Sequence, residues 1–383
     1  MQIKLGDFLR EICIKTVVNN EYPVLTSSKN GIYLQSEYFN KQVASKDNTG
    51  YKIIKKGQFT YRAMSDTGEF YPNILKCVDI GIVSPAYPVF EITNRDIIYP
   101  QYLQYFFRSN TFRYNISGLE QGSTRTSIKF NKMKNIKIKL PPLLEQKKVI
   151  MILDRVGSLI FKRQEQLKYF DELTKSLFIE MFGDLGEDIF GDGLKLLKDV
   201  CQINPKKDNY IANIKDFLVS FVPMSAVSES GEIDTTIIKC YDEVKKGFTS
   251  FIEDDVLFAK ITPFMENGKG AIAKKLKNSV GFGSTEFHVL RPLKDKSNSA
   301  WIYYLTSFSH FRKEAEIKMT GSAGQRRVPA SFLENYKIAL PPIELQNKFA
   351  NFVRGTDKSK LAVKKSLEEL EILKKSLMQK YFA

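Results

Sequence analysis

The sequence predicts an α+β protein in which two globular, mixed-sheet domains are separated by two long helices that form an antiparallel coiled coil. Three observations predict this fold: a repeat at a spacing of two hundred residues, a long proline-free run that ends each copy, and short β-rich runs in the rest of the chain. We expect the globular domains at residues 1–142 and 183–342, and the helices at residues 143–182 and 343–383.

The first globe contains the β-rich runs, at residues 51–54, 58–62 and 81–93, and Gly, Asp, Asn and Pro separate them. Residues 99–114 break this pattern with a mostly aromatic segment at helical spacing, and residues 301–318 are its counterpart in the second globe. We interpret these segments as core and predict one such helix in each globe, which gives α+β domains.

Each long helix follows the same tripeptide, Leu140-Pro141-Pro142 in the first copy and Leu340-Pro341-Pro342 in the second. Proline suits the first turn of a helix because it fixes φ and lacks only an N–H that this turn leaves unpaired. Apolar residues then recur at two positions of a heptad: Leu153, Ile160, Leu167 and Met181 with Val156, Phe170 and Leu177, and in the second copy Val353, Leu367 and Tyr381 with Val363, Leu370 and Leu377. Forty helical residues would span roughly 60 Å. The simplest way to bury two such seams is to pack one against the other.

The repeat also extends upstream of the helices. Residues 81–90 match residues 281–290, and the segment 122–128 matches 321–328, which is one residue longer. The duplication therefore includes whole domains, and the wide differences between matched positions suggest that two related scaffolds carry different surfaces.

The chain is basic, with 58 Lys and Arg against 43 Asp and Glu, a net charge of +15 and a sequence pI near 9.3. This excess suits a polyanionic partner such as nucleic acid, although a generic basic protein would show it too. The four cysteines have no Cys-x-x-Cys spacing, and no apolar run approaches the roughly 18 residues needed to cross a bilayer. We expect no metal site, no disulfide framework and a cytoplasmic location.

The sequence contains no complete set of catalytic residues. Asp234, Glu243 and Lys245 could hold Mg²⁺ for a nuclease, but a Glu-x-Lys triplet is common by chance. His288 lies in an alternating apolar run and His310 in an aromatic helix, where a packing or surface role is expected. The sequence favours a binding role over an enzyme.

The two Leu-Pro-Pro helices, one domain apart, and the run Gly281-Phe282-Gly283-Ser284-Thr285-Glu286-Phe287 with Val289-Leu290-Arg291-Pro292 resemble the specificity subunit of type I restriction-modification systems. The resemblance covers essentially the whole chain. It implies that each globe is a target recognition domain for one half of a split double-stranded DNA site, and that the helices pair as a spacer. It also implies two methyltransferase subunits that carry S-adenosylmethionine, and restriction/translocase subunits that use ATP and Mg²⁺, with no cofactor in this chain.

Base reading needs Arg, Lys, Asn, Gln, Ser or Thr on rigid elements, and phosphate contacts need cations and backbone N–H groups in loops. The candidates for DNA binding are Arg62, Ser84, Ser123, Thr124, Arg125, Lys260, Thr262, Asn267, Lys269, Ser284, Thr285, Gln325, Arg326 and Arg327. A solvated basic turn or a strand end would explain many of them equally well.

The helix starts supply candidates for docking the partner subunits, on the expectation that these side chains are exposed: Gln146, Lys148, Gln346 and Lys348. Polar residues at a helix start also serve solubility alone. Two other functions stay open: a DNA methyltransferase or nuclease with a divergent active site, and a coiled-coil scaffold that binds no DNA.

Overall fold

The computed structural model describes residues 2–38, 45–117, 126–183, 190–206, 216–322 and 324–383. The chain divides into two compact units, Met1–Gln164 with Lys365–Ala383, and Glu165–Lys364, which we call the first and second unit. Both contain sheets and helices, so the predicted mixed α+β class is confirmed. The contacts divide the chain within the long helices, and the domain boundaries expected at residues 142, 182 and 342 stay a prediction.

The first unit is built on a four-stranded antiparallel sheet in the order β2 (Leu9–Ile12), β10 (Val89–Ile92), β6 (Phe59–Thr60), β8 (Asn73–Ile74). Four strand pairs accompany it: β1 (Gln2–Lys4) with β12 (Lys137–Lys139), β3 (Leu25–Ser28) with β4 (Gly31–Leu34), β5 (Lys52–Lys55) with β9 (Ile80–Val83), and β7 (Met64–Ser65) with β11 (Thr126–Ser127). The short helices are η1 (Leu5–Asp7), α1 (Gln35–Tyr38), α2 (Pro100–Phe106), α3 (Asn110–Ser117) and α4 (Phe130–Met133).

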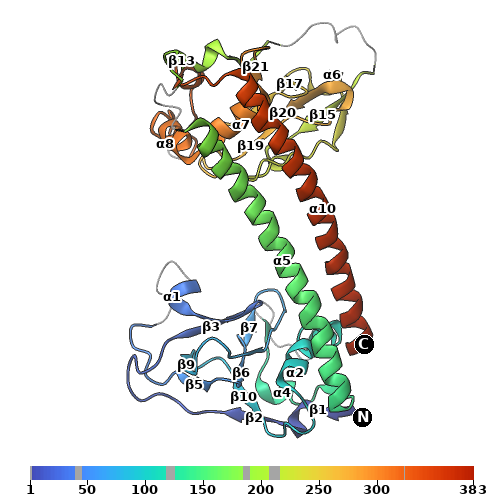
Figure 1. Cartoon of the computed structure of the whole chain (residues 1–383). Helices are drawn as coiled ribbons and strands as arrows, with labels where there is room; N and C mark the ends of the chain where they lie inside the picture. The colour runs from blue at the N-terminus through green and yellow to red at the C-terminus, as the bar shows by residue number, and fades with distance from the viewer. Residues whose placement is uncertain (1, 39–44, 118–125, 184–189, 207–215, 323) are drawn as a thin grey trace. The chain divides into compact units, whose positions relative to one another are not determined.

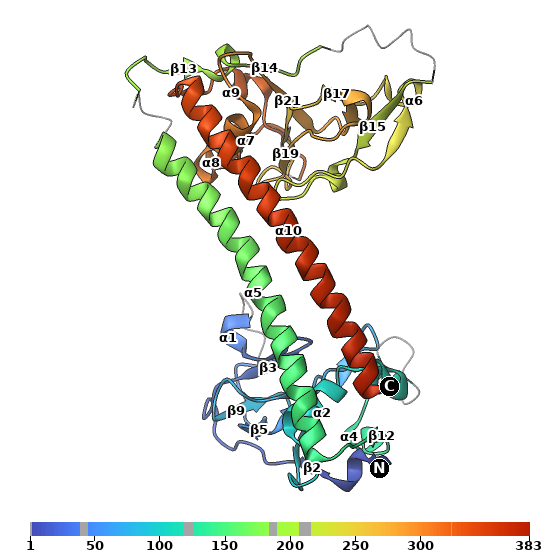
Figure 2. The same ribbon diagram turned by 45° about the vertical axis from the view of Figure 1, so that its right-hand side comes forward.

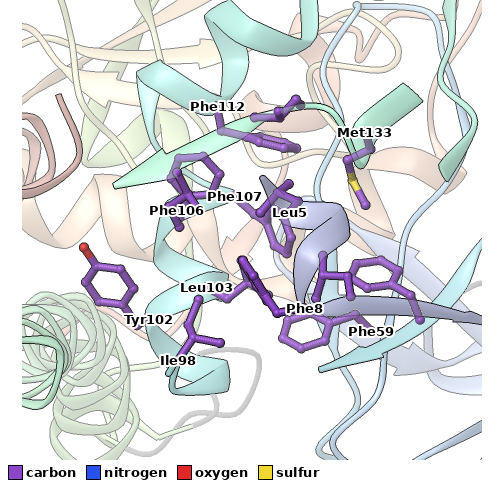
Figure 3. Packing of buried hydrophobic residues seen from close by; sticks show 14 of the residues in the cluster. Leu5, Phe8, Phe59, Ile98, Tyr102, Leu103, Phe106, Phe107, Phe112 and Met133 are labelled. Carbon is purple, nitrogen blue, oxygen red and sulfur yellow. The ribbon is translucent and has the colours of Figure 1, made fainter. Parts of the chain in front are cut away.

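The aromatic segment of the first unit is core, as predicted. Tyr102, Leu103 and Phe106 of α2 are buried, and Figure 3 shows them in one cluster with Phe8 and Phe59. The prediction of a single helix is wrong, because the segment forms two separate helices, α2 and α3. Ser109 separates them: its hydroxyl donates to the carbonyl of Phe106 and accepts from the N–H of Phe112.

The second unit repeats this sheet as β14 (Cys201–Ile203), β21 (Phe287–Pro292), β18 (Val256–Ala259), β19 (Gly270–Ile272). A second, mixed sheet has the order β16 (Ile238–Cys240), β15 (Leu218–Val222), β20 (Val280–Gly283), β17 (Thr249–Ile252), with β15 parallel to β20. The remaining elements are β13 (Lys195–Leu196) paired with β22 (Lys337–Ile338), η2 (Leu197–Asp199), η4 (Met224–Ala226), η5 (Lys277–Ser279), α6 (Tyr241–Val244), α7 (Ser299–Ser307), α8 (Ser309–Ile317) and α9 (Ala330–Glu334). Here too two helices, α7 and α8, replace the one predicted.

The two units share their topology as well as their sequence repeat. In each, a strand near the start pairs with the strand that precedes the long helix, and the four-stranded sheets have the same order. The parallel pairing of β15 with β20 has a short counterpart in the first unit, where Val24 bridges Ile82 in parallel. The duplication predicted from sequence is thus a duplication of folded structure.

The two long helices are α5 (Leu143–Phe182) and α10 (Ile343–Phe382). In the first unit, Phe382 packs on Tyr102 with ring centroids 5.0 Å apart, in the same cluster as Val149 and Leu153. In the second unit, the end of α5 packs on the start of α10, since the rings of Phe178 and Phe349 lie 5.2 Å apart. Within each unit the end of one helix therefore lies beside the start of the other, as Figures 1 and 2 show. The residues of the predicted seams are buried or half-buried.

Candidate nucleic-acid interface

Three segments of the second unit meet at the ends of β18 and β21. The N–H of Lys260, just after β18, donates to the carbonyl of Glu286 at 2.9 Å. The N–H of Val328 donates to the carbonyl of Lys260 at 2.9 Å, and that of Thr262 donates to the carbonyl of Arg326 at 3.0 Å. The backbone thus brings residues 260–262, 284–286 and 326–328 together, and with them six of the predicted DNA-binding residues: Lys260, Thr262, Ser284, Thr285, Arg326 and Arg327.

Arg327 is held by a carboxylate, that of Glu286, which was not among the predicted residues. Its Nε and Nη2 each donate to one carboxylate oxygen of Glu286, both at 2.9 Å. This hydrogen-bonded pairing lowers the pKa of Glu286 and raises that of Arg327, so both groups stay charged through the neutral range. Burial lowers the pKa of Lys260, which lies beside the pair.

Arg326 is paired more loosely. Its Nη2 lies 3.7 Å from Glu266 Oε1 and 3.7 Å from Glu316 Oε1, and the Thr262 hydroxyl donates to the same Oε1 of Glu266 at 2.7 Å. Three acidic residues therefore partner the cations of this surface. Glu286 directly follows Ser284-Thr285 in sequence, which was the one signal that could have identified it.

A second residue that sequence reasoning missed is Arg312 on α8, which is buried beneath the loop that follows Thr262. Its guanidinium donates to the carbonyls of Met265 at 2.7 Å and of Gly268 and Lys269 at 3.3 Å, and it lies over the ring of Phe258. Burial lowers its pKa to about 10, which leaves it charged at neutral pH. Arg312 thus fixes the shape of the loop from the protein interior.

The loop itself carries two predicted residues with different surroundings. Asn267 is exposed at its tip. The amine of Lys269 instead donates to the carbonyl of Met224 at 3.2 Å and lies over the ring of Phe264. Gln325, which directly precedes residues 326–328, is exposed. All three stay predictions, and Asn267 and Gln325 are the more accessible.

The first unit has the same backbone arrangement. The N–H of Ile128 donates to the carbonyl of Ala63 at 3.0 Å, and Thr126 and Ser127 pair with Ser65 and Met64. Arg62 directly precedes Ala63 in the sequence and is exposed. The hydroxyl of Ser84 accepts from the N–H of Ala86 in a turn, the place that Ser284 has in the second unit. The candidates Ser123, Thr124 and Arg125 lie outside the described residues.

His288 is a packing residue of β21, as the sequence predicted. Its Nε2 donates to the carbonyl of Val328 at 2.8 Å, and its Nδ1 accepts from the side-chain amide of Asn204 at 2.9 Å. Burial lowers its pKa to about 4, so the ring is neutral near pH 7.

The structure corrects two of the four docking candidates. Gln146 is fully buried: its Oε1 accepts from the N–H of Tyr99, and its Nε2 donates to the carbonyls of Ile97 and Pro141. Gln346 makes the same bonds in the second unit, to Asn298, Lys296 and Pro341. The predicted exposure is wrong because both side chains satisfy backbone groups of their own globe, which fixes each long helix to it. Lys148 and Lys348 are exposed and stay docking candidates.

The residues that the structure describes contain no group of three or more His, Cys, Asp or Glu side chains that could hold a metal ion. They also contain no helix with the length and apolar content needed to cross a membrane.

The sequence model of a protein family, "Type I restriction modification DNA specificity domain", matches residues 4–169 and 194–372. The chain belongs to this family. The two matched regions coincide with the two repeats, so the family's domain occurs twice here.

Similar proteins agree with this assignment. The EcoEI and EcoAI specificity subunits of Escherichia coli are 45% and 42% identical over 148 and 156 residues, which is 38% and 40% of this chain but 24% and 26% of those proteins. A putative MjaX specificity subunit of Methanocaldococcus jannaschii is 25% identical over 74% of this chain and 68% of its own length.

Solved structures share the fold. A chain from work on complex assembly and conformational transition of the type I R-M system has a TM-score of 0.59 at 18% identity, with 100% of this chain and 97% of that chain covered. The S subunit from M. genitalium has a TM-score of 0.55 at 13% identity, with 100% and 96% covered.

Proposed function

We propose that this chain is the non-catalytic DNA-recognition subunit of a type I restriction-modification complex, and that each globe reads one half of a bipartite target. The observation that supports the proposal is a repeated scaffold with different side chains at its matched loops. The position of Arg327 in the second unit corresponds to Ser127 in the first, because both lie opposite the segment that follows the matched strands β18 and β6. Two scaffolds of one design with unlike surfaces suit two unlike half-sites.

The spacing of the two half-sites is proposed to come from α5 and α10. Each compact unit contains part of both helices, and their buried faces pack within each unit. Forty residues of continuous helix correspond to roughly 60 Å, which is ample for two major-groove contacts about one helical turn of DNA apart.

Docking of methyltransferase subunits is proposed for the exposed residues of α5 in the first unit. Leu144, Met151 and Phe161 have more than half of their surface exposed, at 67%, 63% and 61%. Exposed large apolar residues on one helix indicate a protein contact better than polar residues do. Lys148 lies on the same segment. S-adenosylmethionine, ATP and Mg²⁺ are proposed to bind the partner subunits.

The deciding experiment is methylome sequencing of cells that carry this chain with its methyltransferase partner, compared with cells that carry the partner alone. One new bipartite motif is expected with the chain. Exchange of residues 183–342 for the matching region of a relative should change one half of the motif and leave the other unchanged. A change in both halves, or no motif, would contradict the proposal.

A gel-shift series with random duplex separates the proposal from its rivals. If six or more phosphates are contacted, affinity should fall by roughly a thousandfold between 50 and 200 mM salt. A flat response would support a scaffold. Binding of S-adenosylmethionine by the chain alone, or Mg²⁺-dependent nicking of DNA, would support an enzyme.

A further inference from the structure

The ion pair between Arg327 and Glu286 holds the guanidinium group in one orientation. Besides the two bonds to Glu286, Nη1 donates to the carbonyl of Gln325 at 3.1 Å. The backbone is fixed as well, because the N–H and carbonyl of Arg327 bond to the carbonyl and N–H of Thr320 at 2.8 and 3.0 Å. A side chain held in this way loses little conformational freedom when it binds a further acceptor.

The bonds among the described residues leave Arg327 with one N–H on Nη1 and one on Nη2 for another partner. The side chain is 40% exposed, so this end of the group is open to solvent. Two N–H groups on a planar fork match the O6 and N7 acceptors that guanine presents in the major groove.

The first unit shows that the scaffold forms without this ion pair. There Ser127 has the place of Arg327, and Ala86 has the place of Glu286 in the matched runs 81–90 and 281–290. The backbone bonds between the two segments are nevertheless present, as in the bond from Ile128 to Ala63. A pair that the shared scaffold does not need is a candidate for what distinguishes the two domains.

We propose that Arg327 reads a guanine in the half-site of the second domain, and that Glu286 is the positioning residue that aims it. The inference rests on the proposed function and names the base that this part of the surface selects. A phosphate is a poorer partner for the same edge, because the carboxylate of Glu286 on the same guanidinium would repel it and leaves the pair nearly neutral.

The test is the methylome of cells that carry the full chain and its methyltransferase partner, with Arg327→Lys, Arg327→Ala and Glu286→Gln variants. Lysine keeps the charge but not the planar fork, and Glu286→Gln keeps the shape but not the charge. Arg327→Ala should relax the motif at a single guanine of one half, and Arg327→Lys and Glu286→Gln should relax the same base in part. Lys313 is exposed on α8, and Lys313→Ala removes one positive charge there. This control should leave the motif unchanged.

Three results would overturn the inference while the proposed function stands. These are a half-site without guanine, relaxation in both halves, and an even loss of methylation at every site with an unchanged motif. No new motif with the wild-type chain would remove the proposed function and this inference together.

A binding assay keeps the test independent of any loss of folding in the variants. The assembled complex is titrated with duplex in which the assigned guanine is replaced by 7-deazaguanine, which still pairs with cytosine but lacks N7. The wild-type complex should lose roughly tenfold in affinity or more, and the Arg327→Ala complex, which has no donor at this position, should bind both duplexes equally. An equal loss in the variant would contradict the inference, and melting temperatures within a few degrees of wild type would show that the variants are folded.

Discussion

The buried glutamine at the start of each long helix is expected to matter for folding. In Gln146→Ala, the N–H of Tyr99 and two carbonyls would lose their partner in a site without solvent access. An unsatisfied buried group costs about 1–3 kcal/mol, so urea denaturation should show a loss of at least that size. Lys147→Ala changes an exposed residue of the same turn and should alter the unfolding free energy by less than about 0.5 kcal/mol. Equal effects would mean that the glutamine bonds do not hold the helix.

The buried His288 should make stability depend on pH. Its pKa is about 4 in the folded chain against 6.5 as the ordinary value, so the unfolded chain binds the proton at higher pH than the folded chain does. Stability should therefore rise from pH 4 to 6.5 and be lost as the pH falls through this window. In His288→Gln, which keeps a donor and an acceptor, melting temperatures measured across the window should rise less steeply. An unchanged slope would assign the pH dependence to other groups.

At the residue scale, the sequence predicted types of side chain better than their surroundings. Arg326 and Arg327 could be found as cations in a matched loop, but Glu286 lies 41 residues from Arg327 and becomes its partner through sheet pairing alone. Gln146 and Gln346 were found as matched residues, yet their burial depends on backbone groups some fifty residues away. The type of each residue can be read directly from the sequence, whereas its hydrogen-bond partner depends on the fold.

Among the elements, the loop at residues 263–269 depends on α8 for its shape. Arg312→Met would remove the donors that hold the carbonyls of Met265, Gly268 and Lys269 while keeping an apolar side chain in the core. We expect a loss of about 2–5 kcal/mol in unfolding free energy because several buried acceptors lose their partner. Faster hydrogen exchange at the N–H of Lys269, which bonds to Phe264, should accompany it. If Lys269 exchanged as slowly in Arg312→Met as in the control variant Lys313→Ala, the loop would keep its shape without Arg312.

Elements with strong local signals were predicted well, and those that depend on one residue were not. The bounds of α5 and α10 follow from tandem prolines and from the forty proline-free residues after them. The division of each aromatic segment into two helices was missed, because the aromatic spacing continues through the break. In the second unit the break is Phe308, whose φ of −66° and ψ of 143° are extended. Apolar periodicity reports which face is buried and says little about where a short helix stops.

For the whole molecule, duplication was the most informative feature of the sequence. It predicted two related scaffolds, and the repeated strand orders confirm them. It could not predict how far the matched strands pair. β15 pairs with β20 in parallel over three residues of the second unit, whereas a single bridge from Val24 to Ile82 makes this contact in the first.

If α5 and α10 set the distance between two half-sites, their length should set the gap in the target. Insertion of one seven-residue repeat after Gln164 in α5 and another after Lys364 in α10 would keep both apolar seams in phase. Seven helical residues add roughly 10 Å, which corresponds to about three base pairs at 3.4 Å each. Methylome sequencing should then show the same two half-sites with a gap about three nucleotides longer. Insertion in α5 alone should lower methylation at all sites, because the seams would no longer match. An unchanged gap in the double insertion would show that something other than these helices measures the distance.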